Sequence, residues 1–496
     1  MSFLKILLVS PEAVPYAKTG GLADVAGALP QSLAKLGNTV RLVMPLYRHV
    51  DKDKFDLKQA ASGLTARIAG RDEKFNLYKC GPDIEDLEVL FIDHNGFFDR
   101  PELYRDPSTG NDWHDNDERF GFFCRAVLEI CRSQNFIPDI IHSNDWQSGL
   151  LPALLKVDPS CSDFPNTSTL FSIHNIAYQG NFPPDSFDKL GLEKSLFAPA
   201  GGFEYWKNIS YLKAGIWYSD LINTVSETYA KEIQSSNEYG YGFEGVLKDR
   251  SDDLFGILNG IDYSIWDPSV DELIPAKFGP EKLAGKKRCK NALRKKVKLP
   301  MVRRDIPIIG VISRLADQKG FDLIEQVAGD LMALDIQIVL LGTGDEKYHK
   351  LFSTLQKKYP RKIAALLEFN NEMAHLIEAG SDMFLMPSRY EPCGLNQLYS
   401  LRYGTIPIVR KTGGLADTIE NANPVRGTGN GFVFAKYDAR EMLNTIKFAC
   451  EVYRDKNVWE IMMLRGMRQD FSWDASAKKY IELYNKAIAK KASAIA

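Results

Sequence analysis

The heptapeptide Lys-Thr-Gly-Gly-Leu-Ala-Asp occurs twice in the chain, at residues 18–24 and again at residues 411–417. Each copy follows a run of residues typical of a strand and leads into a helical pattern. Glycines at the start of a helix leave backbone N–H groups open to an anion, and the helix dipole adds attraction. The lysine supplies a mobile cation beside them. The repeat therefore predicts a shared task, holding a phosphorylated or polyhydroxylated ligand, with a tight strand-to-helix turn as the purely structural alternative.

Other ligand-binding patterns are weak in this sequence. The dinucleotide fingerprint G-x-G-x-x-G should directly follow the first strand, but Gly20-Gly21 comes ten residues later and lacks that spacing. Gly342-Thr343-Gly344 follows a strand, yet lysine replaces its third glycine, and there is no Walker A sequence. One loop contains three potential metal ligands, His114, Asp115 and Asp117, but no second cluster of ligands accompanies them in the sequence, so they are weak evidence for a metal site. We therefore expect no metal site and no cofactor.

Composition limits the class of protein. The 496 residues exceed what one ordinary core needs, so two or more domains are expected. Lys plus Arg total 62 against 64 Asp plus Glu, which argues against a dedicated nucleic-acid binder. Seven scattered cysteines without a C-x-x-C pair predict reduced thiols. No apolar run reaches the length of a membrane span, so we expect a soluble, cytoplasmic protein that does not contact a membrane.

Strand and helix patterns alternate along the chain in two series. In the first half, strands are predicted at 3–10, 40–44, 89–93, 140–143, 170–174 and 221–225, with helices at 21–36 and 120–133. In the second half, strands are predicted at 306–313, 336–341, 383–386 and 406–410, with helices at 322–334 and 347–358. Such βαβ alternation favours two Rossmann-like domains with mostly parallel sheets. The join is predicted near Phe255–Pro268, and a final helix near Asp474–Ala489.

The segment from Lys286 to Arg304 contains ten basic residues and no acidic ones. Charge runs without interleaved aromatic residues seldom read nucleic-acid bases. We therefore prefer a solvated helix face to a nucleic-acid contact.

Several further motifs, in a consistent order along nearly the whole chain, carry a resemblance to a known family. They are Asp145–Gly149 (DWQSG), His174–Gly180 (HNIAYQG), Leu258–Asp262 (LNGID), Ser313–Leu315 (SRL) with Gln318–Gly320 (QKG), Glu391–Leu395 (EPCGL), Phe471–Trp473 (FSW) and the two glycine heptapeptides. Together they resemble bacterial glycogen synthases and plant starch synthases.

The resemblance implies an α/β protein of the GT-B fold, with two Rossmann-like doubly wound domains facing across a cleft. The implied domains are 1–257, on the acceptor side, and 258–473, binding the nucleotide sugar. A C-terminal helix, 474–496, would cross back to the first domain. The implied activity is a retaining transfer of glucose from ADP-glucose to the non-reducing end of an α-1,4-glucan such as glycogen.

The resemblance also implies which residues act. Catalytic roles fall on Glu391, His174, Asp145, Arg314 and Lys319. Contacts to the donor fall on Lys18, Gly20, Gly21, Asn259, Arg314, Lys319, Phe369, Cys393, Gly394, Leu395, Thr412, Gly413 and Gly414. The acceptor side falls on Tyr104, Asn116 and Asn175.

The chemistry behind the central assignments is plain. Arg314 and Lys319 would stabilise charge growing on the departing phosphate, and Glu391 would orient the donor sugar by accepting hydroxyl hydrogen bonds. The backbone carbonyl of His174 would stabilise positive charge on the reacting sugar. Structural alternatives stay open: Asp145 as a helix cap, Glu391 as a carboxylate at a helix start and Phe369 as an ordinary core residue.

Two positions differ from the residues expected by resemblance. Tyr399 stands where related GT-B enzymes carry a second glutamate, and Asn396 stands where many family members have threonine. A two-glutamate scheme is therefore not carried over. Without a predicted covalent nucleophile, we prefer same-face substitution assisted by the departing phosphate. Alternatives for the whole protein are a similar transferase using UDP-glucose or another acceptor, and a non-catalytic glucan-binding protein.

Overall fold

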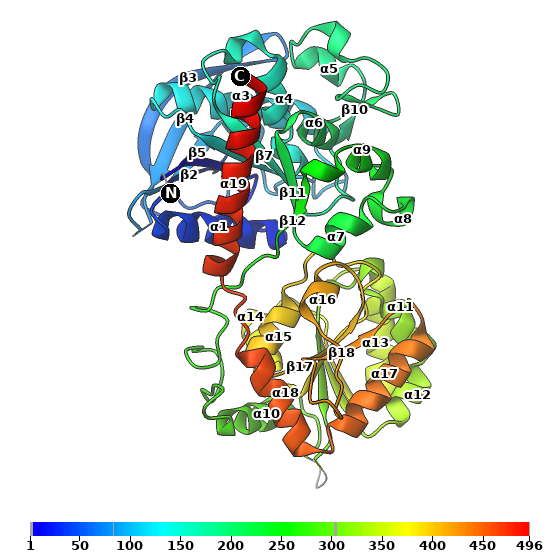
Figure 1. Ribbon diagram of the computed structural model, residues 1–496. Helices are drawn as coiled ribbons and strands as arrows, with labels where there is room; N and C mark the ends of the chain where they lie inside the picture. Colours follow the sequence, from blue (N-terminus) through cyan, green and yellow to red (C-terminus); the bar gives the residue numbers. More distant parts are fainter. Residues whose placement is uncertain (1–2, 83, 302–304, 496) are drawn as a thin grey trace. The chain divides into compact units, whose positions relative to one another are not determined.

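A computed structural model describes residues 3–82, 84–301 and 305–495. The chain forms two compact units, shown in Figure 1. Unit 1 comprises Met1–Val225, Ala230–Ile257 and Trp473–Ala496, and unit 2 comprises Ser226–Tyr229 and Leu258–Ser472. The short stretch Ser226–Tyr229 thus belongs to unit 2, although it precedes the predicted domain boundary.

The sheet of unit 1 has nine strands. Their spatial order is β12 (Leu254–Gly256), β11 (Leu221–Thr224), β7 (Ser168–Ile173), β6 (Ile140–Asn144), β1 (Lys5–Val9), β2 (Thr39–Pro45), β5 (Leu87–Asp93), β4 (Arg71–Cys80) and β3 (Lys58–Ile68). The first seven are parallel, whereas β4 and β3 are antiparallel additions at one edge. The edge hairpin was not predicted, because the first half of β3 is mostly exposed and only its last residues alternate, with Ala66 and Ile68 buried.

Helices cover this sheet, and a small antiparallel sheet adjoins it. The helices are α1 (Gly21–Lys35), α2 (Asn95–Phe98), α3 (Asn116–Ser133), α4 (Leu150–Val157), α5 (Ser186–Lys189), α6 (Tyr211–Tyr218), α8 (Asn237–Gly240), α9 (Glu244–Asp249) and α19 (Trp473–Ile495), with α7 (Glu227–Glu232) at the edge of the unit. The small sheet joins β8 (Asn181–Phe182), β10 (Asn208–Ser210) and β9 (Glu204–Tyr205).

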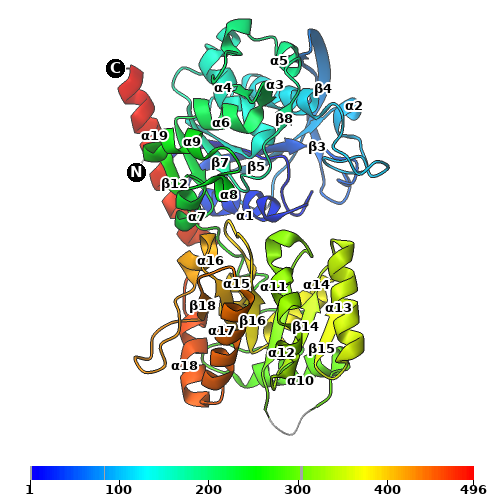
Figure 2. The same ribbon diagram turned by 90° about the vertical axis from the view of Figure 1, so that its right-hand side faces the viewer.

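The C-terminal helix α19 packs beside α1 and against the sheet of unit 1, as Figures 1 and 2 show. A buried polar network fixes it there. His142 Nδ1 lies 2.9 Å from the Tyr484 hydroxyl, and the Asn223 amide donates to the Tyr480 hydroxyl. Burial lowers the pKa of His142 to about 3, so its imidazole is neutral. The predicted return of the C-terminal helix to the first domain is confirmed.

The sheet of unit 2 has six parallel strands, in the order β15 (Ile363–Leu366), β14 (Gln337–Leu341), β13 (Ile308–Ile312), β16 (Met383–Met386), β17 (Ile406–Arg410) and β18 (Phe432–Phe434). Successive side chains point to opposite faces of a strand. In β14, Ile338 and Leu340 enter one apolar cluster, whereas Val339 and Leu341 enter another. The sheet therefore has a core on each face, which the sequence shows as continuous apolar runs.

Helices cover both faces of this second sheet, as Figure 2 shows. They are α10 (Ala284–Lys296), α11 (Phe321–Gln326), α12 (Ala328–Ala333), α13 (Glu346–Lys358), α14 (Asn371–Gly380), α15 (Asn396–Arg402), α16 (Gly413–Thr418), α17 (Ala439–Val452) and α18 (Lys456–Met467). The single helix predicted at 322–334 is instead two helices, interrupted at the buried residue Val327.

The structure corrects the expectation that the basic segment from Lys286 to Arg304 is a solvated helix face. Arg303 and Arg304 lie outside the described residues, but α10 carries most of the segment, and only one of its faces is solvated. Lys286, Lys290 and Arg294, each four residues apart, lie on the buried face. The Lys286 ammonium donates to the Tyr403 carbonyl and the Thr405 hydroxyl, and the pKa of Lys286 falls to about 8 through burial. Buried cations therefore anchor α10 to the rest of unit 2.

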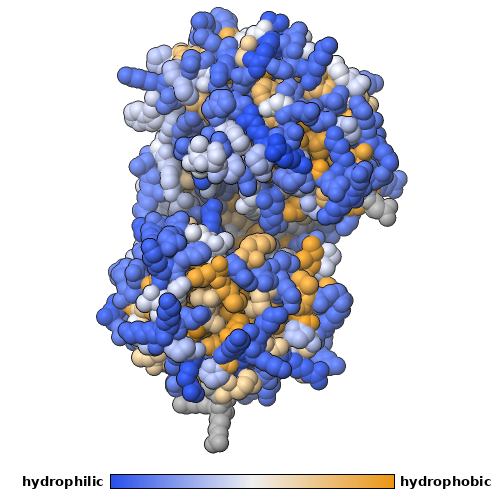
Figure 3. All heavy atoms as spheres, turned by 180° about the vertical axis from the view of Figure 1, so that it is seen from behind, coloured by the Kyte–Doolittle hydropathy of each residue, from blue (hydrophilic) through white to orange (hydrophobic). Residues whose placement is uncertain are grey.

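The surface in Figure 3 is mostly hydrophilic, with hydrophobic residues gathered in patches. Among the described residues, we find no helix both long and apolar enough to cross a membrane.

Candidate functional site

Two predicted residues from distant segments form an ion pair in unit 2. The Lys319 ammonium lies 2.9 and 2.7 Å from the two carboxylate oxygens of Glu391. Lys319 ends a short turn after β13, and Glu391 lies in the loop after β16. Gly320 allows the two loops to touch, because it has a φ of +73° and a Cβ there would lie 2.0 Å from the Pro387 carbonyl oxygen. The Ser388 hydroxyl also donates to Glu391, at 2.9 Å.

The second glycine heptapeptide packs directly against the Glu391 loop. The Gly414 N–H points to the carbonyls of Glu391 and Pro392, at 3.2 and 3.1 Å. Gly413 has a φ of +42°, and a Cβ there would lie 2.0 Å from the Glu391 carbonyl oxygen. A Cβ on Gly414 would lie 2.1 Å from the Cys393 carbonyl oxygen. Both glycines are therefore needed for the close approach of two backbones, and Thr412 is the buried residue before α16.

Cys393, Gly394 and Leu395 lead from this loop into α15. Gly394 has a φ of +70°, which favours glycine. The Asn259 backbone N–H donates to the Cys393 thiol, whose pKa burial raises to about 12. Cys393 is therefore a neutral thiol rather than a nucleophile.

Asn259 itself has an unused acceptor. Its side chain is buried, and within the described part of the chain no group donates a hydrogen bond to its Oδ1. A buried polar atom without a partner is costly, so this oxygen is suited to a ligand hydroxyl or N–H.

Arg314 and Phe369 face solvent from unit 2. Arg314 is exposed just after β13, and no carboxylate of the described residues forms an ion pair with it. Phe369 is 88% exposed in the loop before α14, which corrects the alternative of an ordinary core residue. A free guanidinium and an exposed ring are available to bind a phosphate and to stack on a base.

In unit 1, a carboxylate that the sequence analysis missed organises the first glycine heptapeptide. Glu12 accepts hydrogen bonds from the backbone N–H and hydroxyl of Thr19, and from the Gly20 N–H at 3.4 Å. The Tyr104 hydroxyl donates to the same carboxylate, at 3.2 Å. The pKa of Glu12 is raised overall, because burial outweighs the lowering effect of these hydrogen-bond donors. Glu12 therefore connects the glycine loop to the predicted acceptor-side residue Tyr104.

The two identical heptapeptides differ in their surroundings. In the first copy, a Cβ added at Gly20 or Gly21 would meet nothing within 4 Å. Lys18 is half-exposed and pairs with Asp24 at 2.7 Å, within the same copy. In the second copy, Asp417 instead accepts from Thr228. The first copy thus keeps open space beside its glycines, whereas the backbone of unit 2 fills that space in the second.

Asp145 and His174 lie together in the interior of unit 1. The Asp145 carboxylate accepts the backbone N–H of His174 at 2.7 Å, and also that of Asn175. Burial raises the pKa of Asp145 to about 7, and the nearby Glu12 charge adds to the increase. His174 Nε2 lies 2.9 Å from Asn144 Oδ1, and burial lowers the pKa of His174 to about 3. The imidazole is therefore neutral, so it is unsuited to act as a general acid at neutral pH.

Asp145 is not a helix cap. It has a φ of +55°, and its side chain makes no capping hydrogen bond to the turn that follows. Positive φ is unusual for aspartate and points to a constrained backbone. The Asp145 carboxylate instead accepts hydrogen bonds from the backbone N–H groups of His174 and Asn175.

The remaining acceptor-side residues have mainly internal contacts. Asn116 is buried, donates to the Tyr104 carbonyl at 3.0 Å and accepts from Arg119 at 2.6 Å. Asn175 Oδ1 accepts the Ala177 N–H at 3.1 Å. These contacts fix the loops that carry Tyr104 and His174, and direct binding of an acceptor by Asn116 or Asn175 stays a prediction.

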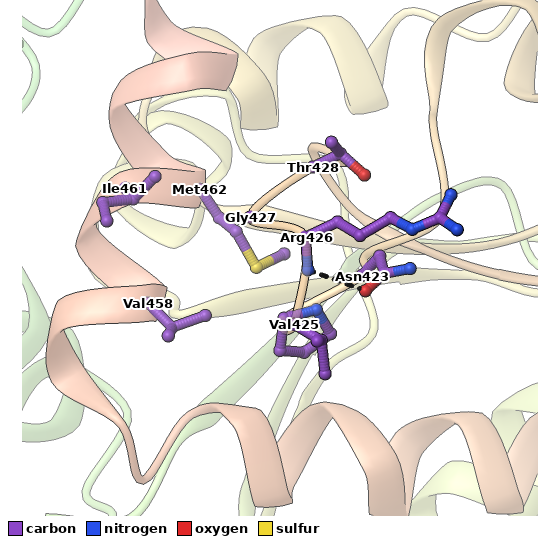
Figure 4. A pocket seen from close by; sticks show the side chains of 9 residues that line it. Asn423, Val425, Arg426, Gly427, Thr428, Val458, Ile461 and Met462 are labelled. Carbon is purple, nitrogen blue, oxygen red and sulfur yellow. Dashed lines mark hydrogen bonds between the residues drawn. The ribbon is translucent and has the colours of Figure 1, made fainter.

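A separate cavity of about 250 Å³ lies between the loop 423–428 and α18, as Figure 4 shows. The Arg426 N–H donates to Asn423 across its rim. None of the predicted site residues lines it. Among the residues that the structure describes, no group of three His, Cys, Asp or Glu side chains is arranged to hold a metal ion.

Known proteins resemble the whole chain. Residues 5–249 match the family model "Starch synthase catalytic domain", and residues 295–459 match "Glycosyl transferases group 1". The glycogen synthase of Koribacter versatilis is 45% identical, with 98% of each chain covered. That of Moorella thermoacetica is 46% identical, covering 99% of this chain and 98% of its own. The chain belongs to the glycogen synthase family.

Solved structures agree with this family assignment. The catalytic domain of starch synthase IV from Arabidopsis thaliana superposes with a TM-score of 0.88 at 32% identity, covering 98% of this chain and all of that one. The sucrose-phosphate synthase of Thermosynechococcus elongatus, at 16% identity and a TM-score of 0.59, shares the fold. The predicted two-domain α/β glycosyltransferase fold is therefore confirmed, as are the resemblance to the glycogen synthase family and the glycosyltransferase activity.

The structure shows what Tyr399 and Asn396 contact in this member of the glycogen synthase family. The Tyr399 ring stacks on Trp266 at 4.0 Å between centroids, and Trp266 stacks on His375 at 3.8 Å on its other side. A glutamate at 399 would lose this stack. Asn396 donates to the Ile312 carbonyl at 2.6 Å and so ties the start of α15 to the end of β13.

In this member of the glycogen synthase family, the sequence motifs did not indicate a role for Glu12. It stands outside the repeated heptapeptide, just after the first strand. The available signal was a carboxylate beside Pro11, in a loop leading to a glycine-rich turn with open N–H groups.

Proposed function

We propose that this glycosyltransferase moves glucose from ADP-glucose to the non-reducing end of an α-1,4-glucan, with retention of configuration. The observation that carries the proposal is the Lys319–Glu391 pair. The second glycine heptapeptide packs against the backbone of the Glu391 loop, and Arg314 is exposed five residues before Lys319. This arrangement offers two cations for a diphosphate and one carboxylate for sugar hydroxyls. The Arabidopsis starch synthase IV structure is described as bound to ADP and acarbose, which supports an adenine nucleotide as the leaving group.

In the proposed reaction, the bond from the glucose anomeric carbon to the diphosphate oxygen breaks, and a bond to the acceptor 4-hydroxyl oxygen forms. Arg314 and Lys319 stabilise the charge that grows on the departing phosphate, without a metal ion. Glu391 orients the donor sugar by accepting its hydroxyl hydrogen bonds. Phe369 stacks on the base, and Asn259 Oδ1 accepts a donor hydrogen bond.

On the unit 1 side, Lys18, Gly20 and Gly21 contribute to donor binding, and Tyr104 contributes to acceptor binding. The neutral His174 acts through its backbone carbonyl, which Asp145 helps to position by binding the adjacent N–H groups. The departing phosphate takes the proton of the incoming 4-hydroxyl, so no covalent glucosyl-enzyme forms.

The test is a transfer assay with purified protein, glycogen and a panel of nucleotide sugars. We expect nucleotide release and chain lengthening from ADP-glucose, α-configured new linkages by proton NMR, and full activity in EDTA. The Arg314→Ala and Lys319→Ala variants should lose turnover by about 10²–10³-fold, as for other groups that stabilise transition-state charge.

Each alternative has its own outcome in this assay. Faster transfer from UDP-glucose would replace the proposed donor. Binding of glycogen without transfer from any nucleotide sugar would indicate the non-catalytic glucan-binding protein. Trapping of a covalent glucosyl-enzyme would overturn the same-face substitution.

A further inference from the structure

A buried arginine lies at the base of the loop 99–115, which joins α2 to α3 and carries the predicted acceptor-side residue Tyr104. Arg119, in the first turn of α3, is fully buried. Burial lowers its pKa only to about 10, so the guanidinium is charged at neutral pH. Within the described part of the chain, no carboxylate forms an ion pair with it, and the Asp115 carboxylate pairs with Arg100 instead. Arg119 is therefore a buried cation bonded to neutral groups.

The Arg119 guanidinium bonds to both ends of the segment that precedes Tyr104. Its Nε donates to the Phe97 carbonyl at 2.7 Å, and its Nη1 donates to the Leu103 carbonyl at 3.1 Å. Nη1 also donates to the Asn116 side chain, at 2.6 Å. The planar fork of an arginine holds two backbone positions in a fixed relation, which the single ammonium of a lysine cannot do. Arg119 thus fixes the start of the loop that leaves α2, the helix labelled at one edge of unit 1 in Figure 2.

The same contacts continue to Tyr104 itself. The Asn116 amide, whose oxygen Arg119 binds, donates to the Tyr104 carbonyl at 3.0 Å. The Trp113 backbone N–H donates to the same carbonyl, also at 3.0 Å. The Tyr104 ring packs against Phe120, with centroids 6.0 Å apart, and the Arg119 guanidinium carbon lies 5.3 Å from the Phe120 centroid. The backbone and the ring of Tyr104 are therefore both positioned by residues that contact Arg119.

The Tyr104 hydroxyl meets the glycine loop from this fixed position. It donates to the Glu12 carboxylate at 3.2 Å. Glu12 also accepts from the backbone N–H and the hydroxyl of Thr19, so the first glycine heptapeptide does not depend on Tyr104 alone. A shift of Tyr104 would therefore alter the predicted acceptor side more than the predicted donor side.

Stability alone does not account for a cation at this place. The Nη2 of Arg119 is buried, and the described residues offer it no acceptor. A buried charge is costly to desolvate, and a well-packed apolar residue of similar volume is often at least as stable. What an arginine supplies here, and an apolar residue could not, is the fixed spacing of the Phe97 and Leu103 carbonyls.

We propose that Arg119 is a positioning residue for the acceptor, which sets the place of Tyr104 through the Leu103 carbonyl and Asn116. The inference rests on the proposed function, in which Tyr104 contributes to acceptor binding. Because Arg119 is buried, it does not touch the substrate itself. Its effect on the reaction passes through Tyr104 and should disappear when the Tyr104 side chain is absent.

The test measures transfer by full-length Arg119→Lys, which keeps the buried charge but cannot hold both carbonyls. At saturating ADP-glucose, we expect the KM for maltotriose to rise about tenfold, while kcat and the KM for ADP-glucose change less than about twofold. Introduced into Tyr104→Ala, the same change should raise the maltotriose KM by less than about twofold, because the residue through which it acts is gone. An unchanged maltotriose KM in the single variant, additive effects in the double variant, or equal rises in the two KM values would overturn the proposal.

Arg125→Met is the matched control, since this arginine lies on the same helix and donates to the Leu190 carbonyl at 2.6 Å, outside the loop. It should leave both KM values unchanged. A second measurement needs no activity: hydrogen exchange of the Trp113 amide should be faster in Arg119→Lys than in wild type or Arg125→Met. If no nucleotide sugar supports transfer but exchange is faster, the proposed function fails and the positioning of Tyr104 by Arg119 stands. Unchanged exchange would overturn that positioning.

Discussion

Replacing Lys319 by methionine tests whether the Lys319–Glu391 pair is both a stabilising contact and part of the reaction. The change removes the ammonium but keeps most of the apolar stem. It leaves the Glu391 carboxylate, whose side chain is 8% exposed, with the Ser388 hydroxyl as its remaining side-chain hydrogen-bond donor among the described residues. A buried charge that loses its counter-ion is expensive.

The magnitude follows from the burial of the pair. Removing one partner of a buried ion pair costs about 3–5 kcal/mol. The Lys319 side chain is 19% exposed and Ser388 still donates, so we expect the lower end, about 3 kcal/mol. For a domain the size of unit 2, this lowers the melting temperature by about 6–12 °C. Adding Glu391→Gln removes the orphaned charge, and about half of the loss should return.

Calorimetry of the full-length variants, following the transition assigned to unit 2, measures these shifts. Turnover is measured alongside, and it should stay at least about 10²-fold low in the double variant, since stability returns but the cation does not. Lys350→Met is the matched control, because its pair with Glu346 in the same unit is 75% exposed on both sides and contributes under about 0.5 kcal/mol. The reasoning is refuted if Lys319→Met melts within about 2 °C of wild type, or if Glu391→Gln destabilises it further.

Three more predictions concern single positions. Gly413→Ala should lower the melting temperature strongly, because its Cβ would collide with backbone. Gly20→Ala should leave the melting temperature unchanged and alter only the donor KM, because its Cβ would meet open space. Equal melting shifts in the two variants would contradict this difference between the two heptapeptides. Because Asp145 has a pKa of about 7 folded and 3.8 unfolded, its burial costs stability increasingly as pH rises between these values. The stability that Asp145→Asn gains over wild type should therefore grow between pH 5 and pH 8, up to about 4 kcal/mol, as measured by parallel thermal melts of the two proteins. A stability difference that stays constant across pH would show that ionisation of Asp145 is not linked to folding. Glu12→Ala should speed hydrogen exchange of the Thr19 amide and raise the donor KM, and unchanged exchange would show that the carboxylate does not order the loop.

Much of the fold could be predicted because periodicity reports burial. The central parallel strands are apolar on both faces, and they appear in the sequence as short β-branched runs between helical patterns. The edge hairpin β3–β4 was not predicted, because its strands are partly exposed and lack these continuous apolar runs. The basic segment was misjudged for a related reason: charge predicts solvent exposure, yet Lys286 lies buried because carbonyl and hydroxyl oxygens of distant segments receive its ammonium.

For the candidate site, motifs determined which residues to consider, but not how they are paired. Two identical heptapeptides predict the same local turn, since glycine and lysine have the same intrinsic properties in both. Only the tertiary structure decides that Gly413 is packed against the Glu391 backbone while Gly20 keeps open space and is bound by Glu12. Likewise, Lys319 and Glu391 are 72 residues apart, and their ion pair depends on two loops meeting at Gly320. Local sequence sets the conformations a segment can adopt, whereas burial and partners from distant segments set the charge, the pKa and the space available for a ligand.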